Sequence, residues 1–327
     1  MPVPSGEPGS GPEWLKKLTA REQARGGTAF DRRQALLSAT ILGKVPERLL
    51  RRDRPLVFPK RTKVMRENVL LEKLRADEVV LGVCNKYPAA GIVEGMCPGW
   101  DFLWIDGQHG EMDYRACMAA VRAAASVGVE SLLRVPGHEA GVLGMYADMS
   151  PSGILVPMVN TPEDARRVVD RLRFPPLGNR SYGGRRVIDL DGRNFYRERE
   201  LAVFAQIETV EALENADAIA ATEGIDVLFF GPDDMKCQMG IPVNTGVLEN
   251  DRLRTALECT AVAARDAGKP CAGVAPSEAT LRVFLKMGYR CLCCGSDSGF
   301  LSAGSHQRRA LMRDVANEQM ESEGDQT

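Results

Sequence analysis

Residues 201–231 read LAVFAQIETVEALENADAIAATEGIDVLFFG, two apolar runs with a helical pattern between them. In each run, Leu201–Ile207 and Asp226–Gly231, the apolar residues follow one another without polar alternation. Short continuous apolar runs of this kind are typical of parallel strands that are buried on both faces. A strand, a helix and a second strand in this order predict one βαβ unit of a parallel sheet.

The same alternation recurs through the middle of the chain. Tyr114–Ser126 is rich in alanine, Thr161–Leu172 opens with proline at its first helical position, and Leu248–Ala267 is long and amphipathic, so each predicts a helix. The expected strands are Val79–Cys84, Phe102–Asp106, Ser131–Val135, Gly153–Pro157, Leu201–Ile207, Asp226–Gly231, Pro270–Ala275 and Tyr289–Cys294. Eight parallel strands close a barrel, so the predicted fold class is α/β, a (β/α)8 TIM barrel with an N-terminal extension. The competing topology, a doubly wound open sheet, lacks support because no GxGxxG motif follows any strand.

The ends of the chain differ from the middle. Residues 1–12 hold four prolines and three glycines, and residues 314–327 carry five acidic side chains and no basic one. We therefore expect a partly disordered N-terminal extension over 1–63, a TIM-barrel domain over 64–313, and an acidic disordered tail over 314–327. Between Lys44 and Lys63 lie eight basic residues, which form either a solvated surface or a patch for an acidic partner.

Composition limits the partners and the compartment of this 327-residue chain. A formal net charge of −2 gives no general attraction for nucleic acid, and no apolar stretch approaches the roughly 18 residues of a membrane span. The opening residues lack the basic and apolar regions of a secretory signal. The nine cysteines are an odd number, which favours reduced thiols over a disulfide framework. We expect a cytoplasmic protein without a membrane or nucleic-acid partner.

Polar side chains gather at the carboxyl ends of the expected strands, where TIM barrels carry their chemistry. They are Asp106, Gln108, His109, Arg134, Gln206, Glu208, Asp233, Asp234 and Asp297. Each has a structural alternative: His109 as a hydrogen-bonded structural residue, Arg134 as an ion-pair partner, and Glu208, Asp233 and Asp234 as carboxylates that begin helices. Arg134 nevertheless needs an anion nearby, because burying an unpaired guanidinium is costly.

The chemistry that fits this set is that of a hard divalent cation with a 2-oxo acid. Two carboxylates from neighbouring strand ends, without a His/Cys cluster, suit Mg²⁺ or Mn²⁺, with Co²⁺ as a further candidate. The remaining coordination positions would take the carboxylate and keto oxygens of the substrate. Arg134 would hold the oxygen that becomes negative, and His109 would carry a proton near neutral pH.

Two other groups have weaker claims to chemistry. Cys291, Cys293 and Cys294 lie on one strand, whose side chains alternate between faces, so they are interpreted as small buried hydrophobes. A Schiff-base mechanism would need a lysine at a strand end, and Lys86 and Lys236 are the candidates. Neither has an evident desolvating pocket in the sequence, so that mechanism ranks low.

A set of motifs in fixed order resembles the HpcH/HpaI aldolase family. The motifs are Leu81-Gly82, FLWIDGQHG at 102–110, Leu133-Arg134, LVPMVN at 155–160, FPPLGNR at 174–180, QIET at 206–209, FFGPDDM at 229–235 and Gly295-Ser296-Asp297. The resemblance covers roughly residues 66 to 312. That family includes the metal-dependent pyruvate aldolases acting on 2,4-dihydroxyhept-2-enedioate and 2-dehydro-3-deoxyglucarate. The ordered set is specific, although each motif alone would be weak.

The resemblance implies both an assembly and an active site. It implies a TIM barrel in a homo-oligomer, commonly a hexamer (a trimer of dimers) with an exchanged C-terminal helix. It implies a divalent metal held by Glu208 and Asp234, and an arginine, Arg134, on the keto or enolate oxygen. The other implied roles are a catalytic His109 supported by Asp106 and Asp148, a pocket residue Gln206, and a Gly231-Pro232-Asp233 turn that binds the pyruvate carboxylate. Binding at that turn agrees with the anion affinity of helix N-termini.

Three departures from the family pattern affect the expected pocket. Gln108 stands where the family has glutamate, which removes a carboxylate from the surroundings of the metal. The loop after the first strand, residues 83–87, is shorter than the family's and lacks its tryptophan. The segment Arg180–Arg186 is unusually basic, and is either a site for an acidic or phosphorylated aldehyde or a solvated loop.

The predicted function is therefore that of a class II aldehyde-lyase, which cleaves or forms 4-hydroxy-2-oxo acids through a pyruvate enolate. A first alternative keeps the enolate and changes the outcome, to oxaloacetate decarboxylation or biosynthetic C–C bond formation. A second alternative is a non-catalytic barrel that binds a partner through its basic N-terminal stretch. The polar set at one rim argues against the second, because a scaffold has no need of it.

Overall fold

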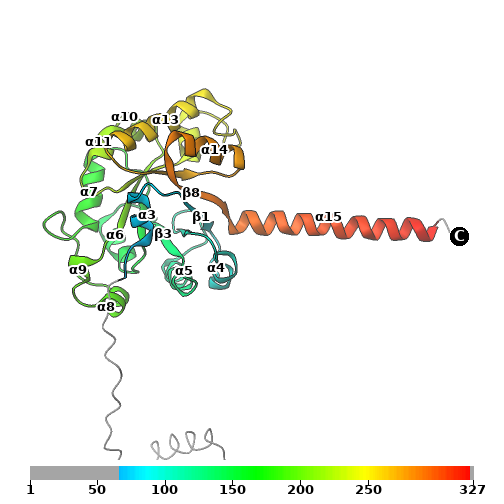
Figure 1. Ribbon diagram of the computed structural model, residues 1–327, viewed down its shortest axis with the longest axis horizontal. Coiled ribbons are helices and arrows are strands. Elements are labelled where there is room, and N and C mark those ends of the chain that lie inside the picture. Colours follow the sequence, from blue (N-terminus) through cyan, green and yellow to red (C-terminus); the bar gives the residue numbers. More distant parts are fainter. Residues whose placement is uncertain (1–65, 325–327) are drawn as a thin grey trace, which may run out of the picture. The chain divides into compact units, whose positions relative to one another are not determined.

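The computed structural model describes residues 66–324, and its centre is a closed barrel of eight parallel strands (Figure 1). The strands follow one another around the barrel in chain order, and β8 pairs with β1 to close it. Their bounds are β1 Val80–Asn85, β2 Phe102–Asp106, β3 Glu130–Arg134, β4 Gly153–Val156, β5 Ala202–Ile207, β6 Val227–Phe230, β7 Cys271–Val274 and β8 Tyr289–Ser296. The predicted TIM barrel is confirmed, and the open sheet is excluded. The predicted extension over 1–63, with its basic stretch Lys44–Lys63, lies outside the described residues.

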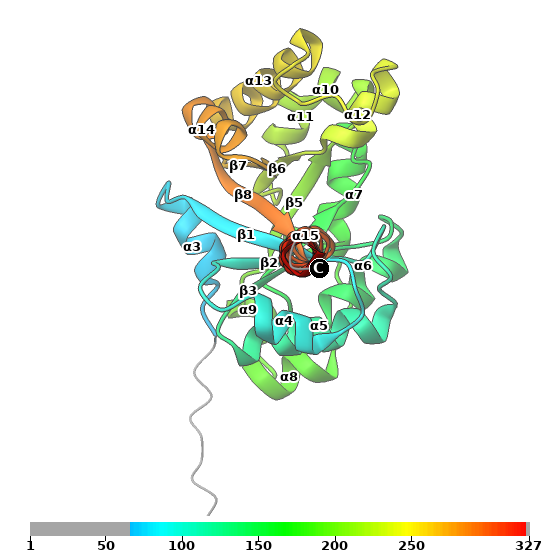
Figure 2. The ribbon, with the colours of Figure 1, turned by 90° about the vertical axis from the view of Figure 1, so that its right-hand side faces the viewer.

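Helices alternate with the strands, and most of them surround the barrel, whereas α15 projects away from it (Figure 1 and Figure 2). They are α3 Val69–Arg75, α4 Ala90–Met96, α5 Tyr114–Ser126, α6 Ala140–Ala147, α7 Pro162–Leu172, α8 Arg185–Asp191, α9 Phe195–Glu198, α10 Val210–Glu214, α11 Ala216–Ala221, α12 Pro232–Met239, α13 Asp251–Asp266, α14 Glu278–Met287 and α15 Asp297–Gly324. The start of α7 shows why the sequence marks it so clearly. Thr161 and Asp164 form a reciprocal capping box, and Pro162 occupies a position that needs no backbone N–H.

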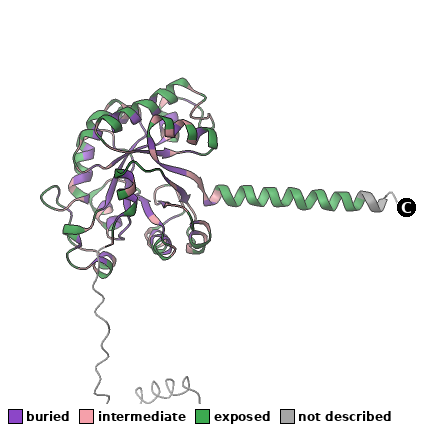
Figure 3. Ribbon diagram, in the orientation of Figure 1, coloured by how far each residue is buried: buried purple, intermediate pink, exposed green. Residues whose placement is uncertain are grey.

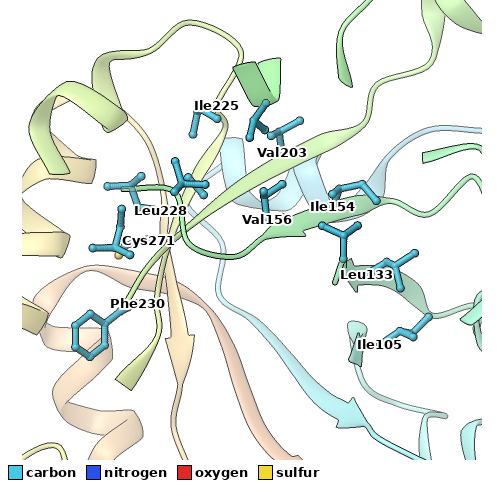
Figure 4. Packing of buried hydrophobic residues seen from close by; sticks show 14 of the residues in the cluster. Ile105, Leu133, Ile154, Val156, Val203, Ile225, Leu228, Phe230 and Cys271 are labelled. Atoms are coloured by element: carbon cyan, nitrogen blue, oxygen red, sulfur yellow. The ribbon is translucent and has the colours of Figure 1, made fainter. Parts of the chain in front are cut away.

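Side chains of the strands alternate between two apolar cores. Ile105 and Leu133 belong to the outer core, between the strands and the helices (Figure 4). Trp104 and Leu132, one residue earlier on the same strands, belong to the inner core, within the barrel. Residues on a strand point alternately to its two faces, so a strand buried on both sides must be apolar throughout.

Helix α3 closes the amino-terminal end of the barrel. Its leucines Leu70, Leu71 and Leu74 are buried in the inner core. Asn68, which caps this helix, donates through Nδ2 to the carbonyl oxygens of Ser152 and Glu200, just before β4 and β5. With that end filled, the opposite end is the one left for a pocket.

The C-terminal helix α15 corrects the prediction of a disordered tail over 314–327. Residues 314–324 continue α15 without a break, because no proline interrupts them and most are good helix formers. Residues 299–320 of this helix are all exposed (Figure 3). Among the described residues, no helix is long and apolar enough to cross a membrane.

Candidate active site

One pocket of about 1030 Å³ opens at the carboxyl ends of the strands. Most of the residues that the sequence singled out line it together: Asp106, His109, Arg134, Gln206, Glu208, Gly231, Pro232, Asp233 and Asp234. Gln108 and Asp148 do not line it. The barrel brings the first group together because parallel strands end at the same rim.

Asp106 and Arg134 form a buried, two-pronged ion pair. Arg134 Nε donates to Asp106 Oδ1 at 2.9 Å and Nη2 donates to Oδ2 at 2.7 Å. These residues are register partners on β2 and β3, so their side chains leave the sheet side by side. Burial opposes ionisation of Asp106, but the ion pair and two backbone N–H groups outweigh it and lower the pKa of this carboxyl. The guanidinium also lies 4.8 Å from the centre of the Trp104 ring.

Asp106 also shapes the loop that carries His109. Its Oδ1 accepts hydrogen bonds from the backbone N–H groups of Gln108 and His109, at 3.2 and 3.1 Å. Asp106 therefore fixes both the arginine and the turn that presents the imidazole to the pocket. Gln108 keeps its side-chain Oε1 buried, without a hydrogen-bond partner among the described residues.

Asp148 pairs with Arg180 and makes no hydrogen bond to His109 within residues 66–324. Its Oδ1 accepts from Arg180 Nη2 at 2.9 Å, and the Arg180 guanidinium lies over the Phe174 ring. Arg180–Arg186 does not line the pocket: Arg185 pairs with Asp189 in solvent, and Arg186 donates to a backbone carbonyl. The predicted support of His109 by Asp148 is thus not formed within this chain and stays a prediction.

Glu208 and Asp234 face each other at the ends of β5 and β6. Glu208 is 1% exposed, and its Oε1 accepts from the backbone N–H of Met158 at 2.8 Å. Burial, reinforced by the neighbouring Asp234, raises the pKa of Glu208 to about 7, although the Met158 hydrogen bond opposes this. Two neighbouring carboxylates repel each other when both are ionised. A bound divalent cation would offset this repulsion.

The hydrogen bond from the Met158 N–H to Glu208 was not predicted from the sequence. Met158 has a φ of 55°, in the left-handed region that non-glycine residues seldom adopt. In that conformation the Met158 N–H donates to Glu208, so a strained backbone position lies at the site. The position lies inside the LVPMVN motif, but a backbone donor leaves no signal in residue type.

Gly231 lets the turn after β6 approach the side chains of Gln206 and Glu208. A Cβ at this position would lie 2.7 Å from Gln206 Nε2 and 2.7 Å from Glu208 Cβ. The turn opens α12 without a side-chain cap. The Gly231 N–H donates to the Ile207 carbonyl at 3.0 Å and Pro232 has no N–H, so the N–H of Asp233 is the first one available to a ligand. This is the geometry of a turn that can receive a substrate carboxylate.

The donor set fits a hard divalent cation that keeps several waters. Glu208 and Asp234 supply two carboxylates, and Gln206 Oε1 is buried beside them without a hydrogen-bond partner. Within residues 66–324 there is no group of three or more His, Cys, Asp and Glu side chains arranged to hold a metal. A site with two protein ligands suits Mg²⁺ or Mn²⁺, whose remaining positions go to water and substrate.

Three further candidates from the sequence have structural roles. Cys291 and Cys293 are buried in the inner core, where desolvation raises the pKa of each thiol, so they stay neutral. Lys236 Nζ donates to Asp233 Oδ1 at 3.0 Å and to the carbonyl of Val243 at 2.9 Å. An amine held in this way is not poised as a nucleophile.

Comparisons with known proteins place the chain in one family. Residues 90–303 match the model of the HpcH/HpaI aldolase/citrate lyase family. The chain is 34% identical over 211 residues to a 4-hydroxy-2-oxovalerate aldolase of Novosphingobium aromaticivorans, covering 63% of this chain and 79% of that protein. It is 32% identical over 248 residues to a hydroxypyruvate/pyruvate aldolase of Deinococcus radiodurans, covering 74% and 87%.

A solved structure agrees with the sequence comparisons. An HpcH/HpaI aldolase/citrate lyase family protein of Burkholderia cenocepacia superposes with a TM-score of 0.70 at 28% identity. The match covers 76% of this chain and all of that one. The resemblance drawn from the ordered motifs, and the aldolase class it implied, are confirmed. The chain belongs to the HpcH/HpaI aldolase/citrate lyase family, whose members are enzymes that depend on a divalent metal.

Proposed function

We propose that this protein is a divalent-metal-dependent aldolase that cleaves or forms 4-hydroxy-2-oxo acids through the enolate of pyruvate. The observation that carries the proposal is the convergence of Glu208, Asp234, Arg134 and His109 in one pocket. An electrostatic site for a developing enolate needs fixed positive charge, and an aldol reaction needs a group that moves protons near neutral pH.

Arg134 stabilises the oxygen that gains charge. Its Nε and Nη2 are committed to Asp106, whereas no hydrogen bond from Nη1 is recorded within the described part of the chain. The buried ion pair holds the guanidinium in place before substrate arrives, so little reorganisation is needed as charge develops. Trp104 beneath the guanidinium supports the same placement.

His109 moves the proton of the substrate hydroxyl. In the cleavage direction this hydroxyl gives its proton to His109, the bond between C3 and C4 breaks, and the electron pair passes into the enolate of pyruvate. The aldehyde leaves, and the enolate carbon then takes up a proton. Addition runs through the same steps in reverse.

Glu208 and Asp234 are the residues that would hold the metal, with Mg²⁺ or Mn²⁺ as the proposed ion and Co²⁺ as a further candidate. When bound, the ion would supply positive charge and an orienting site for the 2-oxo acid. The substrate carboxylate would bind at the Gly231–Asp233 turn through the backbone N–H of Asp233, because the Gly231 N–H donates to the Ile207 carbonyl and Pro232 has no N–H.

The first test follows the methyl protons of pyruvate in D₂O by NMR. Enolate formation predicts that the protein, with Mg²⁺ or Mn²⁺, exchanges these protons for deuterium, and that excess EDTA stops the exchange. An exchange that continues at the same rate in EDTA contradicts the metal assignment. An absence of exchange with every metal tested contradicts the enolate chemistry.

Gln108 motivates the alternative in which the same enolate chemistry leads to a different product. The amide replaces the carboxylate of the family motif, and its buried Oε1 has no partner among the described residues. A less negative surrounding changes the acidity of nearby waters, which would favour oxaloacetate decarboxylation or biosynthetic C–C bond formation. Product analysis with oxaloacetate and with 4-hydroxy-2-oxo acids separates these outcomes from aldol cleavage.

We further propose that the protein forms a homo-oligomer through α15. Exposed apolar residues lie along this helix: Phe300, Leu301, Leu311, Met312, Val315 and Met320. Leu311 and Val315 share one face, being four residues apart. A helix with so many exposed apolar side chains is typical of one that packs against another chain.

We also propose that the protein is located in the cytoplasm, because its nine cysteines are unpaired thiols.

The double substitution Leu311→Asp/Val315→Asp tests this assembly. We expect the particle to dissociate into smaller species, because two charges would enter an apolar contact. Light scattering coupled to size-exclusion chromatography measures the mass. The matched control, Ser302→Asp/Asn317→Asp, adds the same two negative charges at exposed polar positions of the same helix and tests whether charge alone disrupts the assembly. An unchanged mass in the Leu311/Val315 variant contradicts the proposal.

A further inference from the structure

Lys86 differs from the other basic side chains that line the pocket. Arg134 is committed to Asp106, and Lys236 to Asp233 and a backbone carbonyl. The ammonium group of Lys86 makes no hydrogen bond or ion pair within the described part of the chain. A half-buried cation that lines a pocket without a carboxylate is available to an anionic ligand.

The backbone of Lys86 is held on both sides. Its N–H donates to Asp297 Oδ2 at 2.9 Å, and its carbonyl accepts from the N–H of Glu111 at 2.8 Å. Asp297, which is 1% exposed, also accepts from Asn85 Nδ2 at 2.8 Å and from the Tyr87 N–H at 2.9 Å. The backbone position is thus determined, whereas the ammonium remains uncommitted.

The positive charge of Lys86 affects two thiols that line the pocket. Cys84 and Cys293 line the pocket, and burial raises the pKa of both thiols. The positive charge of Lys86 partly opposes the rise at each of them. This electrostatic effect agrees with the pocket lining in placing the charge near the mouth of the barrel.

The order of the strands places Lys86 across the mouth from the two acids. Lys86 follows β1, and Glu208 follows β5, which lies opposite β1 in a closed barrel of eight. His109 follows β2, directly beside β1, and the Glu111 hydrogen bond ties its loop to Lys86. A substrate bound at Glu208 and Arg134 that reacts beside His109 therefore extends toward Lys86.

We propose that Lys86 binds the anionic group of the acceptor aldehyde, a carboxylate or a phosphate, and so makes the enzyme select charged acceptors over their neutral counterparts. This inference rests on the proposed aldolase function. Arg180–Arg186, the basic segment that the sequence offered for such a group, does not line the pocket. Lys86 is therefore the specificity residue that this fold provides.

Steady-state kinetics of aldol addition to pyruvate test the selection directly. The carboxylate pair is 4-oxobutanoate against butanal, and the phosphate pair is glyceraldehyde 3-phosphate against glyceraldehyde. We expect Lys86→Met to lower the ratio of kcat/KM, charged over neutral, by about tenfold to a hundredfold, which is the usual value of a charged hydrogen bond. The pair whose ratio falls identifies carboxylate or phosphate as the preferred group.

Two variants control for indirect effects. Lys86→Arg keeps the charge and should retain most of the selectivity, whereas a purely structural role for lysine would leave the ratio unchanged in both variants. Lys286→Met removes the same charge from an exposed position of α14 and should leave the ratio at its wild-type value. Equal losses with charged and neutral acceptors in Lys86→Met overturn the proposal.

A binding measurement separates this inference from the proposed function. Calorimetric titration with succinate, a dicarboxylate that cannot react, measures the anion site without catalysis, and phosphate is titrated in the same way. Weaker binding in Lys86→Met that Lys86→Arg restores supports the site even when no methyl exchange of pyruvate occurs. Affinities for both anions that do not depend on Lys86 overturn it, even when methyl exchange confirms the enolate.

Discussion

Replacing Arg134 by alanine should lower kcat/KM for aldol cleavage by about a thousandfold or more. Loss of one donor to a developing oxyanion costs about a hundredfold to a thousandfold. The variant also leaves the Asp106 carboxylate buried without its ion-pair partner, which costs about 3–5 kcal/mol of stability. Steady-state kinetics and thermal unfolding measure the two effects separately.

A second substitution distinguishes catalysis from stability. Asp106→Asn in the Arg134→Ala background removes the unpaired charge, so thermal stability should recover while activity should not. Arg134→Lys keeps a positive charge but cannot reproduce the two-pronged contact with Asp106. We expect intermediate activity for that variant. Activity that returns together with stability in the double variant would show that Arg134 is only structural.

Replacing Glu208 by glutamine, or Asp234 by asparagine, should abolish metal-dependent exchange of the pyruvate methyl protons. Each substitution preserves size and removes one of two carboxylates, so Mn²⁺ affinity should fall at least a hundredfold. Calorimetric titration with Mn²⁺ measures the affinity. Asp233→Asn is the matched control, because Asp233 lies on the same turn but pairs with Lys236. Undiminished Mn²⁺ binding in Glu208→Gln would contradict the assignment.

The same pair predicts a pH dependence of metal binding. Burial and the neighbouring Asp234 raise the pKa of Glu208 to about 7 in the metal-free protein, so its carboxyl is protonated below that pH. A metal must displace this proton, so Mn²⁺ affinity should rise as the pH increases through about 7. Glu208→Gln should lose this part of the dependence. An affinity that is flat between pH 6 and 8 contradicts the prediction.

The strand bounds show how well apolar runs in the sequence predict the strands. The predicted strand Phe102–Asp106 agrees with β2 at both ends, and the predicted Asp226–Gly231 exceeds β6 by one residue at each end. Strands buried on both faces must be apolar throughout, and that pattern is local in the sequence. The tail prediction failed because acidic composition favours solvent exposure but does not oppose helix formation. Residues 314–324 are both exposed, where described, and helical.

The sequence placed most of the candidate residues at one rim, but it did not predict their contacts. Strand ends and ordered motifs brought Asp106, His109, Arg134 and Glu208 to one rim. The donation from Met158 to Glu208 depends on a backbone conformation, and the pairing of Asp148 with Arg180 joins segments 32 residues apart. Neither leaves a pattern along the chain, because residue type says which bonds a side chain is able to make and not which neighbour it meets.

By itself, the sequence determined the barrel fold, the placement of the candidate residues at the carboxyl ends of its strands, and the family. Each of these rests on local periodicity or on ordered motifs. Only the tertiary structure decided which charges remain available. Arg134 and Lys236 are committed to carboxylates, whereas Lys86 and the pair Glu208 and Asp234 line the pocket without an ion-pair partner among the described residues. Charge compensation is a property of distances in space, because the interaction between two groups depends on their separation and burial and not on their positions along the chain.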